Sequence, residues 1–264
     1  MLTLRLDSPA NRRAFHALLW RPEDSATAAS GRRRLAIILH GRQPATMVDG
    51  PATIHRLYPF AEALQTASDY YGMDICIPLM GNKAYCDSPI DPNVRHATFL
   101  GDELPGLLAR EHGATSDRRD RCLLGFSMGG TGAINILARH AERFAVAVNF
   151  AGNCDPAFYP TTLGCRSPAE DVLGPYETHA AHFVQWSNFH AVTAVAGRRD
   201  VAIALGCGRD DPRLANIRRL HRQLLDQGSI CTYGDYPGGH VYDLAHVLLQ
   251  CAAADHLWRS LRAA

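Results

Sequence analysis

Short apolar runs alternate with longer stretches of helical periodicity along most of the chain, and this alternation limits the fold more than any other feature. Residues 35–39 are apolar at every position. Both faces of such a run must be buried, as in a central strand of a parallel sheet. Strands that alternate with helices form βαβ units, which put helices on both faces of the sheet. The sequence therefore predicts an α/β fold with a mainly parallel sheet.

Strands are expected at 35–39, 73–78, 121–125, 144–150, 201–205 and 229–236, and helices at 55–69, 96–111, 128–140, 212–227 and 241–259.

Three segments depart from this alternation. Residues 2–6 and 14–20 are apolar runs on either side of a Ser-Pro-Ala-Asn turn and predict a β-hairpin at the edge of the sheet. Pro105 falls inside a helical pattern and predicts a kink or a break there. Residues 152–190 have weak periodicity and predict a small cap insertion over a site. With no internal repeat and no domain boundary, residues 1–264 are expected to form a single domain.

Charge and hydropathy exclude several kinds of partner. The 27 basic and 26 acidic side chains nearly cancel, which argues against nucleic acid or an anionic membrane as the main partner. The N-terminus carries Arg5 and Asp7 and has no long apolar stretch, so neither a secretory signal nor a membrane span is expected. The sequence thus predicts a cytoplasmic protein that acts on a small molecule. It leaves open whether the chain forms a homodimer.

Metal and cofactor motifs are missing from the sequence. The eight cysteines include no Cys-x-x-Cys pair and no zinc-finger spacing. His179 and His182 stand three residues apart, but no carboxylate-rich helix accompanies them. Neither a metal nor a cofactor is expected.

The segment 125–129, Gly-Phe-Ser-Met-Gly, joins a predicted strand to a predicted helix. Gly-x-Ser-x-Gly in this context is typical of a nucleophile elbow, a tight turn that holds the serine in a strained conformation. Side chains at Gly125 and Gly129 would collide with the neighbouring strand and helix. The hydroxyl of Ser127 would lie at the helix N-terminus, where N–H groups and the helix dipole favour a developing anion. The motif alone also admits a glycine-rich turn with a bystander serine.

A serine hydroxyl needs a base, and the base needs an acid that orients it. In chains with this elbow the order is serine, acid, histidine. His240 lies in a glycine-rich loop after the last strand, from which it can reach Ser127. Asp210 and Asp211 both follow the strand 201–205, and the carboxyl ends of such strands are where sites of this kind form. Asp211 is preferred as the acid, although it could also be an N-cap for the next helix.

The remaining parts of the predicted site are backbone donors and a pocket. Met128, directly after the serine, should donate one N–H to an oxyanion, and Gly41 or Arg42 should donate the second. The loop 79–95 and the segment 152–190 are expected to line the pocket. The candidate substrate-binding side chains are His40, Lys83, Tyr85, Phe158, Tyr159 and Trp186.

Together these pieces resemble the esterase branch of the α/β-hydrolases, which includes esterase D (S-formylglutathione hydrolase), feruloyl-esterase-like proteins and the antigen 85 mycolyltransferases. The resemblance implies the α/β-hydrolase fold. Its Gly-x-x-Asp pattern again selects Asp211 as the acid. It does not extend to the residues that recognise substrate. The resembling segments, in the family's order, are 39–41, 99–104, 125–130, 208–211 and 237–240.

The sequence therefore predicts a serine hydrolase that cleaves a carboxylic ester or thioester through an acyl-enzyme on Ser127. Two alternatives remain open. An acyltransferase would use the same residues but pass the acyl group to an acceptor other than water. A binding protein could retain the hydrolase fold without catalysis.

Overall fold

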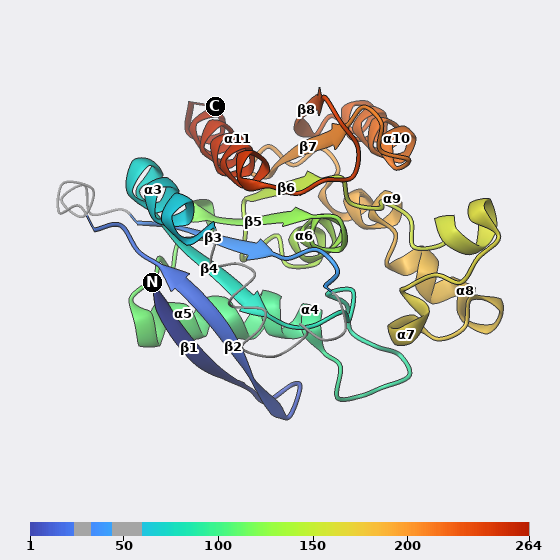
Figure 1. Cartoon of the computed structure of the whole chain (residues 1–264), viewed down its shortest axis with the longest axis horizontal. Coiled ribbons are helices and arrows are strands. Elements are labelled where there is room, and N and C mark those ends of the chain that lie inside the picture. Colours follow the sequence, from blue (N-terminus) through green and yellow to red (C-terminus); the bar gives the residue numbers. More distant parts are fainter. Residues whose placement is uncertain (24–32, 44–59, 264) are drawn as a thin grey trace.

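The computed structural model describes residues 1–23, 33–43 and 60–263. They form an eight-stranded sheet in the order β1-β2-β4-β3-β5-β6-β7-β8 (Figure 1). β1 pairs antiparallel with β2, and β2 with β4, whereas every other neighbouring pair is parallel. The bounds are β1 Leu2–Ser8, β2 Arg13–Trp20, β3 Arg34–Leu39, β4 Met73–Leu79, β5 Arg121–Phe126, β6 Val146–Phe150, β7 Ala202–Gly208 and β8 Ile230–Tyr236.

Strand burial follows the sequence patterns. In β1 the buried positions alternate with exposed ones, as expected for a hairpin at the edge of a sheet. By contrast, every position of β4, β5, β6 and β7 is buried, since helices cover both faces. The predicted edge hairpin and the predicted strands are all present. The carboxyl ends of the parallel strands meet at one edge of the sheet, which is where a site is expected.

Helices cover both faces of the sheet. α3 and α11 contact each other on one face, while α6 packs on β3, β5 and β6 from the other side, with α9 and then α10 beside it (Figure 1). The predicted helix 55–69 is found as α3, and residues 55–59 lie outside the described residues. The bounds are α3 Ala61–Tyr71, α4 His96–Thr98, α5 Leu104–His112, α6 Met128–Arg139, α7 Glu170–Leu173, α8 Tyr176–Gln185, α9 Asn188–Ala191, α10 Leu214–Asp226 and α11 Leu244–Ala263, with the short elements η3 Phe99–Glu103, η4 Arg118–Asp120, η5 Tyr159–Leu163 and η6 Val192–Val195.

At Pro105, where a kink or a break was predicted, the structure has a π-helical turn just before the proline and no interruption of the helix. α4, η3 and α5 run on without interruption, and η3 between them is a π-helical turn. There the N–H of Leu104 donates to the carbonyl of Phe99, one residue farther back than in an α-helix. Proline has no N–H to donate, so a wider turn just before it avoids a clash with the preceding backbone.

The segment 152–190 contains η5, the short helices α7 and α8 and all but the last residue of α9. α7 and α8 lie beyond the carboxyl ends of the strands (Figure 1). They share a small apolar cluster with the loop 79–95, separate from the main core. Its buried members are Cys86, Val94, Val172, Leu173 and Phe183. Within the described ranges, no helix combines the length and the apolar character needed to cross a membrane.

Candidate active site

Ser127 occupies a sharp turn between β5 and α6. Its backbone is in a strained region, with φ 54° and ψ −120°. A Cβ on Gly125 would lie 2.1 Å from the carbonyl oxygen of Gly129, and one on Gly129 would lie 1.9 Å from that of Leu39. Both glycines are therefore required by the close approach of backbone to backbone, and the turn has the geometry predicted for a nucleophile elbow.

Hydrogen bonds hold this turn in place from several directions. The N–H of Ser127 donates to the carbonyl of Phe150, and its own carbonyl accepts from the N–H of Thr131. The buried side chain of Gln250, on α11, donates to the carbonyl of Gly125 over 2.8 Å. The strained conformation is thus fixed by neighbouring strands and helices.

Three side chains from separate loops form one hydrogen-bonded chain at the carboxyl end of the sheet. His240 follows β8, and its Nε2 lies 2.9 Å from Ser127 Oγ. Its Nδ1 lies 2.6 Å from Oδ2 of Asp211, which follows β7. Asp210 is exposed, and its backbone N–H donates to the carbonyl of Gly238. Of the two candidate acids, Asp211 is the one that reaches the imidazole.

The side chain of Asp211 has no exposed surface. Burial by itself raises the pKa of its carboxyl. The hydrogen bonds from His240 and from the backbone N–H of Arg213, together with the charges of those residues, outweigh burial, so the pKa of Asp211 lies below its usual value. The carboxylate is therefore ionised at neutral pH. Asp211 also accepts from the backbone N–H of Arg213, but Arg213 itself occupies the N-cap position of α10, so the alternative prediction that Asp211 is the N-cap of that helix is wrong.

The predicted oxyanion donors flank Ser127. Met128 is the first residue of α6, so its N–H has no acceptor within the helix. A Cβ on Gly41 would lie 3.6 Å from Ser127 Cβ, which brings the loop after β3 against the serine. The carbonyl of Gly41 is held by His40 Nδ1 at 2.8 Å and by Gln43 Nε2 at 3.1 Å. Because a trans peptide points its N–H opposite to its carbonyl, these bonds also fix the N–H of Arg42.

Ser127 lines a cavity of about 540 Å³, and part of its wall comes from residues of the predicted cap, 152–190. Of the predicted substrate-binding side chains, His40, Tyr159 and Trp186 line it. The rest of the lining is largely apolar and amide side chains with two arginines: Arg42, Gln43, Phe60, Asn82, Ala84, Cys86, Phe126, Met128, Thr131, Asn135, Asn153, Pro156, Ser167, Pro168, Ala169, Leu173, Arg213, His240 and Tyr242, together with Gly41.

The other three predicted lining residues, Lys83, Tyr85 and Phe158, do not line the cavity. The backbone of Tyr85 has φ 55°, which turns its ring into the core, where it is 1% exposed. Its hydroxyl donates to the carbonyl of His40 over 2.9 Å. Tyr85 therefore holds the loop after β3, which lies beside Ser127. The sequence pattern did not indicate this role.

Sequence reasoning also missed Arg213, Gln250 and Phe126 as parts of the site. Arg213 contacts Asp211 directly. The ring of Phe126 stacks on that of His240. No local pattern marks Arg213 or Gln250, because each meets the site only through the tertiary fold.

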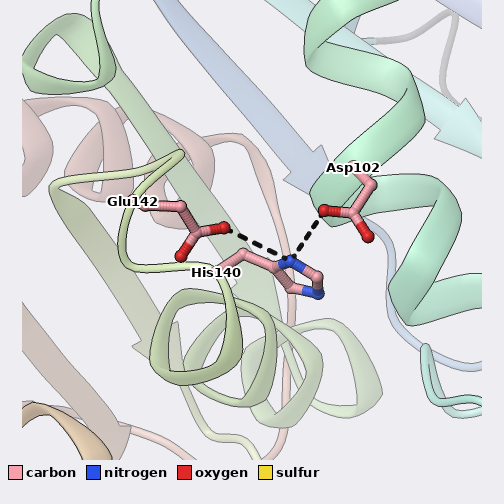
Figure 2. A group of neighbouring side chains, drawn as sticks. All are labelled: Asp102, His140 and Glu142. Atoms are coloured by element: carbon pink, nitrogen blue, oxygen red, sulfur yellow. Dashed lines mark ion pairs between the residues drawn. The ribbon is translucent and has the colours of Figure 1, made fainter.

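One group in the described part of the chain has the composition of a metal site, and it lies away from Ser127. His140 Nδ1 is 3.2 Å from Asp102 and 3.8 Å from Glu142 (Figure 2). His140 follows the last residue of α6, thirteen residues after Ser127, or about 20 Å along the helix. Both carboxylates are at least half exposed, so the arrangement is that of a surface ion-pair cluster.

Comparison with known proteins identifies the family. A model of the Esterase family, described as "Putative esterase", matches residues 82–245, a range that contains Ser127, Asp211 and His240. The chain belongs to this family. The resemblance drawn from the sequence motifs is confirmed.

A curated relative illustrates the similarity in sequence. An uncharacterized protein of Corynebacterium glutamicum is 23% identical over an alignment of 220 residues, and the alignment covers 77% of this chain and 49% of that protein. The chain thus spans about half the length of the curated relative that it matches.

A ferulic acid esterase superposes with a TM-score of 0.73 at 20% identity, over 98% of both chains. The substrate-bound fluorophosphonate-binding serine hydrolase F of Staphylococcus aureus superposes with a TM-score of 0.73 at 16% identity, over 99% of this chain and 96% of that one. Likeness at this level of identity confirms the predicted α/β-hydrolase fold.

Proposed function

We propose that the chain is a serine hydrolase that cleaves a carboxylic ester or thioester through an acyl-enzyme on Ser127. The observation that carries the proposal is the continuous chain from Ser127 Oγ through both nitrogens of His240 to Asp211, with distances of 2.9 Å and 2.6 Å. A hydroxyl, an imidazole and a buried carboxylate in this order form a nucleophile, its base and the group that orients the base.

In the acylation step, Ser127 Oγ attacks the ester carbonyl while Nε2 of His240 accepts its proton. Asp211 holds the tautomer in which Nδ1 carries hydrogen and stabilises the imidazolium that forms. The N–H groups of Met128 and of Gly41 or Arg42 would stabilise the oxyanion. As the tetrahedral intermediate collapses, the bond between the former carbonyl carbon and the leaving oxygen or sulfur breaks, and His240 returns the proton to the leaving alcohol or thiol.

In the deacylation step, water attacks the acyl-enzyme while His240 removes its proton, and the carboxylic acid and free Ser127 are formed. An organic alcohol or amine could replace water with the same proton transfers, so the acyltransferase alternative shares every residue. Product analysis with and without added acceptors separates the two, because transfer would yield a new ester or amide.

The size of the cavity supports a substrate with a bulky group. Along α6 its wall is formed by Ser127, Thr131 and Asn135, each four residues after the previous one and so on one side of the helix. Eight residues of helix span about 12 Å. Leu173 and Trp186, from the segment 152–190, form an apolar part of the wall. We propose that an apolar or aromatic arm of the ester extends along this wall.

Labelling with a fluorophosphonate probe, together with hydrolysis of p-nitrophenyl esters, tests the proposal. The wild-type chain should react with the probe, and Ser127→Ala should not. His240→Ala and Asp211→Asn should each lower kcat by several orders of magnitude. Asp210→Asn is the matched control, since this exposed neighbour should retain full activity. A wild-type chain that neither labels nor hydrolyses esters would favour the binding-protein alternative.

A further inference from the structure

The two carboxylate oxygens of Asp211 have different partners. Oδ2 lies 2.6 Å from Nδ1 of His240. Oδ1 accepts from the backbone N–H of Arg213 over 2.9 Å and from Nη1 of the same arginine over 3.3 Å. Arg213 therefore donates two hydrogen bonds to the oxygen that does not contact His240, one from its backbone and one from its side chain.

The same guanidinium reaches the cap. Nη2 of Arg213 donates to the hydroxyl of Tyr159 over 3.2 Å. Tyr159 begins η5 in the cap segment, whereas Arg213 directly precedes α10. Both side chains line the cavity, and only 18% of the arginine side chain is exposed. The planar guanidinium of Arg213 thus connects Asp211, the acid of the proposed triad, to Tyr159 in the cap.

This arrangement fixes the carboxylate in two ways. A carboxylate held at only one point can rotate about its χ2 torsion, and rotation would turn Oδ2 away from His240. A second donor to Oδ1 opposes that rotation. The positive charge of Arg213 also compensates a buried negative charge, which would otherwise be costly to keep ionised. The fixed fork of guanidinium donors allows one side chain to hold two acceptors at once.

We propose that Arg213 is a positioning residue for the acid of the triad and that Tyr159 fixes it from the cap, so that the cap and the alignment of His240 are coupled. The inference rests on the proposed function. It implies that this part of the cap contributes to catalytic alignment as well as to the walls of the cavity.

Other titratable groups near Asp211 do not replace the arginine. Burial raises the pKa of the Cys207 thiol to about 12, and it also raises the pKa of the Tyr236 phenol. Both groups are therefore neutral at physiological pH. Among the described residues, His240 and Arg213 are the hydrogen-bond partners of the Asp211 side chain.

The test compares Arg213→Gln, Arg213→Lys, Tyr159→Phe and the double variant Arg213→Gln/Tyr159→Phe in ester hydrolysis. We expect Arg213→Gln to lower kcat by about 10- to 100-fold, as for small misplacements of a catalytic group, with a smaller change in KM. The backbone N–H bond survives the substitution, so activity should fall without vanishing. Arg213→Lys keeps the charge but not the fork, and should lose less kcat than Arg213→Gln.

Tyr159→Phe keeps the ring on the cavity wall and removes the acceptor of the guanidinium. A fall in kcat of a few-fold is expected. Because both substitutions break one linkage, the double variant should be no slower than Arg213→Gln alone. Additive losses would show that Tyr159 and Arg213 act separately, and would overturn the coupling.

The pH profile gives a readout that a purely structural role would not change. Arg213 is one of the groups that lower the pKa of Asp211. Its loss should therefore raise the pKa of that carboxyl and move the acid limb of kcat/KM to higher pH. Arg218→Gln is the matched control, because this exposed arginine of α10 pairs instead with Asp235. It should leave both kcat and the limb unchanged.

Thermal unfolding of each variant shows whether it is folded, so that kcat values are compared between folded proteins. An Arg213→Gln protein that is folded and keeps the wild-type kcat and acid limb would overturn the proposal. A change confined to KM would overturn it too, because that result would make Arg213 a substrate-binding residue. Failure of the proposed function is distinct, since it would appear in the wild-type chain as absence of both labelling and hydrolysis.

Discussion

The phenyl ring of Phe126 stacks on the imidazole of His240, with ring centroids 4.7 Å apart and planes inclined by 28°. Tyr242 stacks on Phe126 in turn, at 4.6 Å and 21°. The residue directly before the serine therefore orients the imidazole, which lies in a loop more than a hundred residues later in the sequence. This contact fixes the plane of the ring, whereas Asp211 fixes its rotation within that plane.

Replacing Phe126 by leucine should loosen the imidazole. Aromatic pairs of this kind contribute about 0.5–1.5 kcal/mol beyond their buried area. If this stabilisation of the productive orientation of His240 is lost, kcat for ester hydrolysis should fall by about 2- to 13-fold. Phe189→Leu removes a partly buried ring on α9, away from the cavity, and should leave kcat unchanged. Equal kcat values for the wild type and Phe126→Leu would mean that the stack does not orient His240.

Gly129→Ala should disrupt the elbow. The added methyl would lie 1.9 Å from the carbonyl oxygen of Leu39, and neither backbone can move without disturbing β3 or α6. We expect a loss of about 3 kcal/mol or more in the free energy of unfolding, measured by urea denaturation.

The matched control is Gly234→Ala in β8, where an added Cβ would meet nothing within 4 Å. This change should be neutral or slightly stabilising, since alanine loses less conformational entropy on folding than glycine does. Similar destabilisation by both substitutions would indicate that the close approach at Gly129 is not the cause.

The low pKa of Asp211 predicts a pH dependence of stability. Burial opposes its ionisation, but the partners His240 and Arg213 more than compensate, so the folded carboxyl has a pKa below the ordinary value of 3.8. Its ionised form therefore contributes stability that is fully present above that value and is lost as pH falls through the lower folded pKa. Unfolding of the wild type and of Asp211→Asn, measured between about pH 7 and pH 3, should show a free-energy difference that narrows at the acid end. A difference that stays constant or widens there would contradict the assigned partners.

The parts of the fold that sequence patterns predicted are those specified locally. The fully apolar run of β3 and the alternating hairpin at β1 reflect burial on both faces and on one face of a sheet. The steric need for glycine at 125 and 129 follows from the turn itself. The order serine, acid, histidine then predicted which loops meet, because parallel strands end at the same edge.

The parts that could not be predicted depend on contacts between distant segments. Tyr85 looked like a pocket residue, but a left-handed backbone turns it inward. Arg213 gives no local signal, because its partners are brought together only by the cap and the turn after β7. The cap helices are short and irregular, so their periodicity was too weak to predict them.

The most direct test of the account is to trap the acyl-enzyme. The protein is mixed with an activated ester, quenched in acid within the first turnover, digested and analysed by mass spectrometry. The account predicts one acyl adduct, on the peptide that contains Ser127, and none on Ser127→Ala. An adduct on another residue, or ester hydrolysis that persists in Ser127→Ala at the wild-type rate, would contradict it.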